Sequence, residues 1–372
     1  MNTKAYLANG VVKAHAAELA ALGHNALIVT GKNSAQKCGA LADVIAALEE
    51  GGVSYSIFNC VEENPSIETV RTGAALGNAF FSDFVIGIGG GSPMDAAKAI
   101  SVLLKNPMKS WKILYEKEPY DAYPVAEIPT TCGTGSEVTG ASVLTRHDLG
   151  TKVTAKQYVY PDLALIDPAY LASAPRTVIR NTAIDALGHL IESYVNTLAT
   201  VQSREKSLTG LHIWKRCKAY IEGAEITDRE EEKQMFADLL LASDYAGMAI
   251  LTASTSLPHA LSYYLTYEKH VPHGMAIGIY LPAFLREADE EDQKALLDAG
   301  GFEDIEDFDR FISRNCIKPL LGEYASLQEL RTINEKSVGS VLSDEARLAR
   351  VPFEVNEMVI GRIAAGSEEV IC

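Results

Sequence analysis

The first half of the chain alternates between short apolar runs and longer segments with apolar residues at helical spacing. The apolar runs predict buried strands at 25–30, 53–58, 84–88 and 124–128, with a last strand within 158–167. The segments between them predict helices at 11–22, 35–50 and 66–79. Strands that alternate with helices are typical of a parallel sheet covered on both faces, so we expect an α/β domain.

The second half is helical in pattern almost throughout. Asp167-Pro168 and Pro175 interrupt the alternation, and predict a boundary between a domain 1–176 and a domain 177–372. Helical periodicity then covers 203–221, 228–252, 257–266 and 273–285 and continues to about residue 365. We therefore expect an all-helical second domain, with the acidic run 287–292 as a solvated turn.

Charge and composition exclude several classes of partner. The 372 residues carry a net charge of −16 and a pI near 5.0, which argues against nucleic acid or an anionic membrane surface as partner. We expect no run long and apolar enough to cross a bilayer, and the first residues lack the long apolar core of a signal peptide. The six cysteines are scattered without a Cys-x-x-Cys motif, as in reduced cytoplasmic proteins. We expect a cytoplasmic protein.

A glycine-rich loop follows the predicted strand 84–88. Gly89, Gly90 and Gly91 lead through Ser92 into a helix, where glycines allow close backbone approach and the first N–H groups attract a pyrophosphate. We expect Ser92 to cap this helix, with Pro93 at its first position and Asp95 completing a pair like a capping box. The spacing departs from a strict G-x-G-x-x-G, so this loop alone does not establish a nucleotide site.

A second polar loop follows the predicted strand 124–128. Thr130, Thr131 and Thr134 lie in a run of threonine, serine and glycine that spans 129–139. The run could be a plain turn. Its place after a strand of a parallel sheet is nevertheless where ligands bind in such folds.

Metal-ligand chemistry is concentrated in the second half. Asp185 and His189 are four residues apart in the predicted helix 181–194, so they share one face, which is mostly apolar. We expect Asn181 or Thr182 to cap this helix. The pair could be a hydrogen bond in a core.

Two further histidines change the balance between these interpretations. His259 and His273 lie some seventy residues or more downstream, each next to a proline in an apolar setting. One aspartate plus three histidines is a plausible ligand set for a divalent transition metal with room for a substrate oxygen.

With these motifs in place, the whole chain resembles the iron-containing (group III) alcohol dehydrogenases. The resemblance implies a Rossmann-like parallel-sheet domain that binds NAD or NADP, and a helical domain that holds Fe²⁺, or Zn²⁺ in some members. It implies a small alcohol or aldehyde as substrate and a homodimer or larger homo-oligomer. The implied metal ligands are Asp185, His189, His259 and His273. The implied cofactor-binding residues are Gly31, Asn33, Ser34, Gly89, Gly90, Gly91, Ser92, Asp95, Thr130, Thr131, Thr134 and Lys152.

The sequence departs from the family pattern around the substrate. Many members carry a histidine where this chain has Tyr263, and His270 replaces part of a glycine-rich link; either residue could relay the proton. After the first predicted strand, Gly31-Lys32-Asn33-Ser34 contains no carboxylate to repel a 2′-phosphate. We therefore expect NADPH to be accepted, with a preference for it left open.

The substrate remains open between several small molecules. The surroundings of His259 and His273 look more like members that act on ω-hydroxy acids such as 4-hydroxybutyrate; a phosphonate aldehyde or a short diol is also compatible. Arg146, His147 and Lys152 could attract an anionic substrate or be solvated loop residues.

Other functions on the same fold are a zinc glycerol dehydrogenase, a dehydroquinate synthase and a non-catalytic scaffold. No basic cluster for a phosphate-bearing substrate occurs in 225–275, which argues against the synthase. An unneeded ligand set would be costly to bury, which argues against the scaffold.

Overall fold

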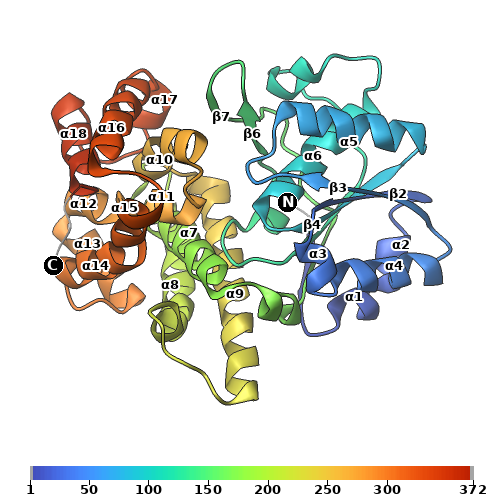
Figure 1. Ribbon diagram of the computed structural model, residues 1–372, viewed down its shortest axis with the longest axis horizontal. Helices are drawn as coiled ribbons and strands as arrows, with labels where there is room; N and C mark the ends of the chain where they lie inside the picture. Colours follow the sequence, from blue (N-terminus) through green and yellow to red (C-terminus); the bar gives the residue numbers. More distant parts are fainter. Residues whose placement is uncertain (1–2, 369–372) are drawn as a thin grey trace. The chain divides into compact units, whose positions relative to one another are not determined.

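The computed structural model describes residues 3–368, and the chain divides into two compact units (Figure 1). Unit 1 is Met1–Pro175 and unit 2 is Arg176–Cys372. Unit 1 is an α/β domain and unit 2 is helical, so the predicted fold class is confirmed.

Unit 1 is built on a six-stranded parallel sheet with the order β1-β8-β5-β4-β2-β3. Its strands are β1 (Lys4–Leu7), β2 (Asn25–Gly31), β3 (Ser54–Val61), β4 (Phe84–Gly89), β5 (Val125–Pro129) and β8 (Leu163–Ile166). A separate antiparallel hairpin joins β6 (Val143–Arg146) to β7 (Thr151–Thr154). The sequence pattern indicated neither this hairpin nor β1, because each of these strands has only four residues.

Alternate residues of the central strands enter different cores. Ile28 and Ile86 pack with α1 (Val11–Ala14), α2 (Ala16–Ala20), α3 (Ser34–Lys37) and α4 (Ala40–Glu50). Leu27 and Val85 pack on the other face with α5 (Ile67–Ala79) and α6 (Gly91–Lys105). Figure 1 shows these helices on opposite sides of the sheet. Burial on both faces explains why the central strands are continuous apolar runs.

The order of the strands places the polar loops at one edge of the sheet. From β2 the chain crosses to β3 on one side, then returns past β2 to β4 and continues to β5 and β8. This reversal between β2 and β4 is a topological switch point, outside whose carboxyl ends ligands bind in such sheets. The loops that follow β2, β4 and β5 all start there because the strands are parallel.

Two predicted helices of unit 1 are interrupted. The helix predicted at 11–22 breaks at His15, and the one predicted at 35–50 breaks at Gly39, whose φ of 90° is left-handed. A hydrophobic period continues across such breaks because both pieces cover the same face of the sheet, so periodicity alone did not reveal them.

Unit 1 also contains a group of charged side chains that we call the lysine cluster: the buried Lys98, Glu127 and Glu137 and the half-buried Asp95. The Lys98 ammonium is fully buried and donates to the Ser136 carbonyl (2.6 Å) and hydroxyl (2.6 Å) and lies 3.6 Å from Glu127 Oε2. Burial raises the pKa of the Glu127 carboxyl well above its usual value, against the lowering effect of Lys98. This cluster therefore contains its own cation.

Unit 2 has α7 at its centre. The long helices are α7 (Arg176–Val195), α8 (Val201–Ile221) and α9 (Arg229–Ala253), which pack against one another. The remaining helices are α10 (Leu257–Lys269), α11 (His273–Gly278), α12 (Leu281–Arg286), α13 (Glu290–Gly300), α14 (Ile305–Ile312), α15 (Lys318–Glu323), α16 (Leu327–Leu342), α17 (Glu345–Leu348) and α18 (Glu357–Gly366). A π-helical turn, Ser313–Ile317, joins α14 to α15.

Several local predictions for unit 2 are wrong. Because α7 begins at Arg176, Asn181 and Thr182 lie inside the helix, and the Thr182 hydroxyl bonds back to Val178 O (3.0 Å) instead of capping. The helix predicted at 273–285 is two helices, α11 and α12. The acidic run 287–292 is not simply solvated, because Asp289 caps α13 and the buried Asp292 pairs with Arg204 at 3.0 Å.

By length and composition alone, one helix is long and apolar enough to cross a membrane, contrary to the sequence-based expectation. This helix is α9, and 61% of its most apolar window is buried within the structure. Its contacts with α7 and α8 account for that apolar surface, as in the core helix of a globular domain. Among residues 3–368 no disulfide joins the cysteines; Cys372 lies outside them.

Candidate active site

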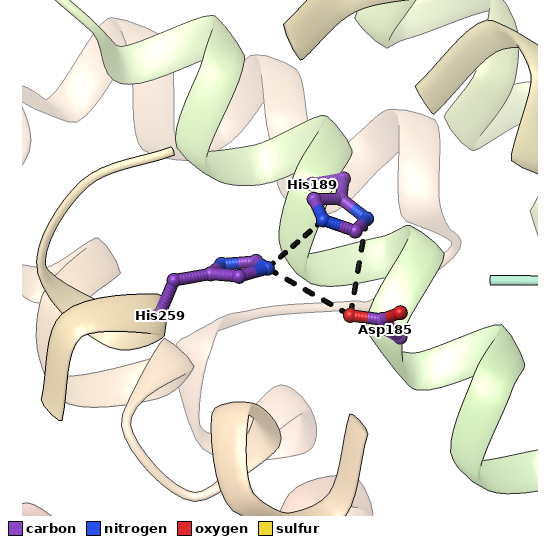
Figure 2. Close-up of side chains that lie close together, drawn as sticks. All are labelled: Asp185, His189 and His259. Atoms are coloured by element: carbon purple, nitrogen blue, oxygen red, sulfur yellow. Dashed lines mark hydrogen bonds and ion pairs between the residues drawn. The ribbon is translucent and has the colours of Figure 1, made fainter. Parts of the chain in front are cut away.

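Three of the four predicted metal ligands converge inside unit 2 (Figure 2). We call Asp185, His189 and His259 the histidine cluster. One ligand atom from each lies within 4.8 Å of the others, and all three side chains are buried. The two Nε2 atoms of His189 and His259 are 2.9 Å apart, and His259 Nε2 lies 3.7 Å from Asp185 Oδ1. Helix α7 supplies two of these side chains one turn apart, and α10 supplies the third.

The histidine cluster fits a divalent cation. The buried Asp185 Oδ1 has no hydrogen-bond partner, and in the described part of the chain no lysine or arginine forms an ion pair with Asp185. Ligands about 2.1 Å from an ion in tetrahedral arrangement stand about 3.4 Å apart, close to the separations seen. An imidazole pair that faces a bare carboxylate oxygen is costly to bury without a positive charge between them. The residues therefore suit Fe²⁺ or Zn²⁺.

A buried carboxylate supports His259 from behind. Glu192 forms a short hydrogen bond with His259 Nδ1 and accepts from the Ser256 N–H at 2.6 Å and the Ser256 hydroxyl at 3.2 Å. Burial alone raises the pKa of Glu192, but His259 and the Ser256 N–H outweigh it and lower that pKa. The ionised carboxylate can only accept, so it keeps the proton on His259 Nδ1 and leaves the Nε2 lone pair for a metal.

The fourth predicted ligand, His273, lies beside this group. Its ring centroid is 5.5 Å from that of His259, with the rings nearly perpendicular. The neighbouring Gly274 explains the close approach of α11 to α7, since an added Cβ would stand 1.7 Å from Asn181 O. His273 begins α11 directly before this glycine, and its ring lies beside that of His259 on α10.

The two candidates for proton relay differ in position. Tyr263 follows His259 by four residues on α10, so it continues the same helix face. His270 is exposed at the left-handed end of α10, with φ 54°. The structure thus places Tyr263 on the face of α10 that carries His259, and His270 at an exposed helix end.

The predicted nucleotide loops touch each other in unit 1. A Cβ on Gly90 would stand 3.0 Å from Thr131 Oγ1, and one on Gly91 would stand 2.6 Å from Thr134 Cγ2. The Thr130 N–H donates to Gly89 O at 2.7 Å. Glycine is therefore needed for the loop after β4 to pack against the loop after β5, and both stand at the carboxyl edge next to the switch point.

The predicted capping of α6 is wrong. The helix begins at Gly91 with Gly90 as its cap, and no side chain caps it. Ser92 Oγ instead accepts from the Asn64 N–H at 3.0 Å. Asp95 accepts from the Ser136 hydroxyl (2.7 Å) and the Val143 N–H (2.8 Å), so its carboxylate holds the following loop and hairpin in place. No side chain therefore caps the first N–H groups of α6.

Comparison with known proteins agrees with these features. Residues 2–168 match the family model "iron-containing alcohol dehydrogenase", and residues 179–302 match the C-terminal domain model of the same family. The chain belongs to the iron-containing alcohol dehydrogenase family. The predicted resemblance and the prediction of an oxidoreductase are thereby confirmed.

Individual relatives have related activities. The chain is 33% identical to an NADPH-dependent butanol dehydrogenase of Clostridium saccharobutylicum, over 71% of this chain and 68% of that protein. It is 31% identical to a lactaldehyde reductase of Escherichia coli K12, over 77% and 74%. The solved iron-containing alcohol dehydrogenase of Thermotoga maritima is 35% identical, with a TM-score of 0.85 over 99% of this chain and 98% of that one.

Two supporting residues of this family member were missed by sequence reasoning. Glu192 completes the spacing i, i+4, i+7 with Asp185 and His189, so the helical period carried a signal for it. Asn64 has a left-handed φ of 57° and accepts from Lys152 Nζ at 3.2 Å while its N–H donates to Ser92. No sequence pattern indicated that Asn64 would join two of the predicted cofactor residues.

Proposed function

We propose that this family member is an NADPH-accepting, Fe²⁺-dependent aldehyde reductase and alcohol dehydrogenase whose metal ligands are Asp185, His189, His259 and His273. The observation that carries the proposal is the histidine cluster with its unpartnered Asp185 oxygen. Zn²⁺ suits the same donor set. When bound, the cation supplies a Lewis acid that polarises an aldehyde carbonyl and lowers the pKa of an alcohol.

The residues of the site have separate tasks in this proposal. Asp185 contributes negative charge, and Glu192 fixes the tautomer of His259 so that Nε2 can act as a ligand. Tyr263 is the proposed proton carrier, since its phenol lies one turn beyond His259 on the same face of α10. A bound nicotinamide would supply the hydride-transfer chemistry, and the protein would supply its orientation and electrostatics.

Cofactor recognition rests on the edge of the sheet in unit 1. The Gly89–Ser92 loop and the N-terminus of α6 would hold the pyrophosphate, with Thr130, Thr131 and Thr134 beside them. Gly31, Asn33 and Ser34 follow the neighbouring strand β2, and this turn offers no carboxylate to the adenosine ribose. We therefore propose that NADPH is accepted as well as NADH.

We propose a small aldehyde as substrate, with an ω-oxo acid such as succinic semialdehyde or a phosphonate aldehyde as the finer possibilities. The basic residues of the hairpin do not supply the matching charge. Arg146 pairs with Asp148 (2.7 Å) and lies over the Trp111 ring, and Lys152 bonds to Asn64. A cytoplasmic homo-oligomer completes the proposal.

Anaerobic purification followed by elemental analysis and an aldehyde panel tests the proposed function. We expect about one equivalent of iron or zinc per chain, and turnover of short aldehydes with both NADPH and NADH. Turnover at full rate after complete removal of metal would contradict the metal-dependent mechanism. A large preference for NADH in paired steady-state kinetics would contradict the cofactor proposal.

A further inference from the structure

Arg347 is an enclosed cation in unit 2 with an unused donor. It lies in α17, and only 15% of its side chain is exposed. Its Nη1 atom is buried and has no hydrogen-bond partner. A guanidinium has five N–H donors in a fixed plane, so an unused buried nitrogen on it is costly unless an acceptor arrives from outside.

The position of Arg347 relates it to the ligand-bearing helix. Its guanidinium carbon lies 5.3 Å from the centroid of the Tyr263 ring, and Tyr263 is one helical turn after His259. Burial alone lowers the pKa of Arg347, but Tyr263, Asp344 and Glu192 together raise it, so the group stays charged. Glu192 is the carboxylate that holds His259. A permanent positive charge therefore stands close to the face of α10 that carries the metal ligand.

The charge of Arg347 is only partly balanced. Asp344 approaches Arg347 Nε at 3.4 Å, but 47% of the Asp344 side chain is exposed and its Oδ1 already accepts from the Arg347 backbone N–H. An oxygen atom of a second anion would match the unused Nη1 atom. A metal cation would be repelled there, so the missing partner is an anion.

The neighbouring Arg350 shows what a purely structural arginine looks like in this segment. Its guanidinium donates to the Ser254 hydroxyl at 2.9 Å and to Thr255 O at 3.2 Å, which ties the segment to the loop before α10. Arg350 thus performs the anchoring task. The unused nitrogen of Arg347 is not needed for it.

We propose that Arg347 is a specificity residue that binds a terminal carboxylate, or an oxyanion of similar size, on the aldehyde substrate. The inference rests on the proposed function, because it requires the aldehyde end of the same molecule to react at the histidine cluster. It selects anionic aldehydes from the wider range that a small-aldehyde reductase accepts.

Steady-state kinetics of the metal-loaded enzyme with saturating NADPH test this inference. The substrates are succinic semialdehyde, which carries a carboxylate, and butanal, a neutral aldehyde of the same chain length. For Arg347→Met we expect KM for succinic semialdehyde to rise about 10- to 100-fold, the loss of one charged hydrogen-bonded pair. We expect kcat/KM for butanal to change less than about threefold, because the neutral aldehyde makes no such pair. Arg347→Lys should recover part of the loss.

The controls separate specificity from structure and from the proposed function. Arg350→Met should lower the melting temperature while keeping the ratio of the two kcat/KM values. An equal loss of kcat/KM on both aldehydes in Arg347→Met would overturn the inference. If that variant fails to fold, a wild-type kcat/KM that is higher for butanal than for succinic semialdehyde would overturn it instead. If the wild-type enzyme reduces butanal as efficiently as succinic semialdehyde, only the inference about Arg347 is contradicted. If it reduces neither aldehyde, the proposed function is contradicted as well.

Discussion

Both units bury ionisable side chains, but the two clusters obtain their positive charge differently. In the lysine cluster of unit 1, Lys98 stands among Asp95, Glu127 and Glu137 and donates three hydrogen bonds. In the histidine cluster of unit 2, two imidazoles face Asp185, whose Oδ1 atom has no donor. A buried carboxylate therefore indicates a bound cation only where no lysine or arginine of the same protein balances its charge.

Removal of a ligand from the histidine cluster should have the largest effect. We expect His259→Ala to lose bound metal and aldehyde reduction together, because the variant removes one of three converging donors. Elemental analysis and steady-state kinetics on the same preparation provide the measurement. His212→Ala is the matched control, since His212 is exposed on α8. Normal metal content in His259→Ala would remove this residue from the ligand set.

Removal of the cation from the lysine cluster should mainly cost stability. Lys98→Met leaves the acids of that cluster without their positive charge, so we expect the free energy of unfolding to fall by about 3 kcal/mol. Denaturant titration measures it, with the exposed Lys109→Met as control. Metal content per folded chain should stay at the wild-type value. A loss of metal in folded Lys98→Met would contradict the prediction that the lysine cluster has no part in metal binding.

Loss of the hydrogen bond between Glu192 and His259 should weaken metal binding less than loss of His259 itself. Glutamine at position 192 cannot accept from both His259 and Ser256, because one end of its amide is a donor. Glu192→Gln should therefore weaken metal binding about 10- to 100-fold while the chain stays folded. Competition with a chelator measures the dissociation constant. The surface variant Glu205→Gln should bind metal like wild type; equal affinities for all three proteins would show that Glu192 does not orient His259.

The smallest effect should appear in the pH dependence of stability. Glu127 keeps its proton in the folded state at pH values where the unfolded chain releases it, because burial raises its folded pKa. The free energy of unfolding therefore falls as pH rises from the ordinary value of 4.5 toward the raised pKa. Glu127→Gln removes this slope and should be about 1–2 kcal/mol more stable at pH 8. Parallel curves for the two proteins would contradict the protonated state of Glu127.

The sequence indicated the features that repeat locally. Central strands such as β2 and β4 are apolar on both faces, and α7 carries Asp185 and His189 one turn apart, so periodicity predicted both. The glycines of the loop after β4 were visible as a motif. The physical reason for these glycines is close packing against Thr131 and Thr134, which the sequence motif does not reveal.

Other features depend on contacts between distant segments. The capping prediction failed because Ser92 bonds to Asn64, 28 residues away, and Asp95 bonds to the hairpin that no pattern predicted. The charge near Tyr263 comes from Arg347, which lies in a four-residue helix late in the chain. Neither contact leaves a periodic trace in the sequence, since each is set by tertiary packing.

Anomalous diffraction at the iron edge, from crystals grown anaerobically with Fe²⁺, tests the central claim most directly. We expect one strong peak among Asp185 Oδ, the imidazole nitrogens of His189 and His259, and His273. A zinc-edge peak at the same place would keep the site and change only the metal. Crystals of active enzyme with no metal peak there, or with the peak elsewhere, would contradict the account.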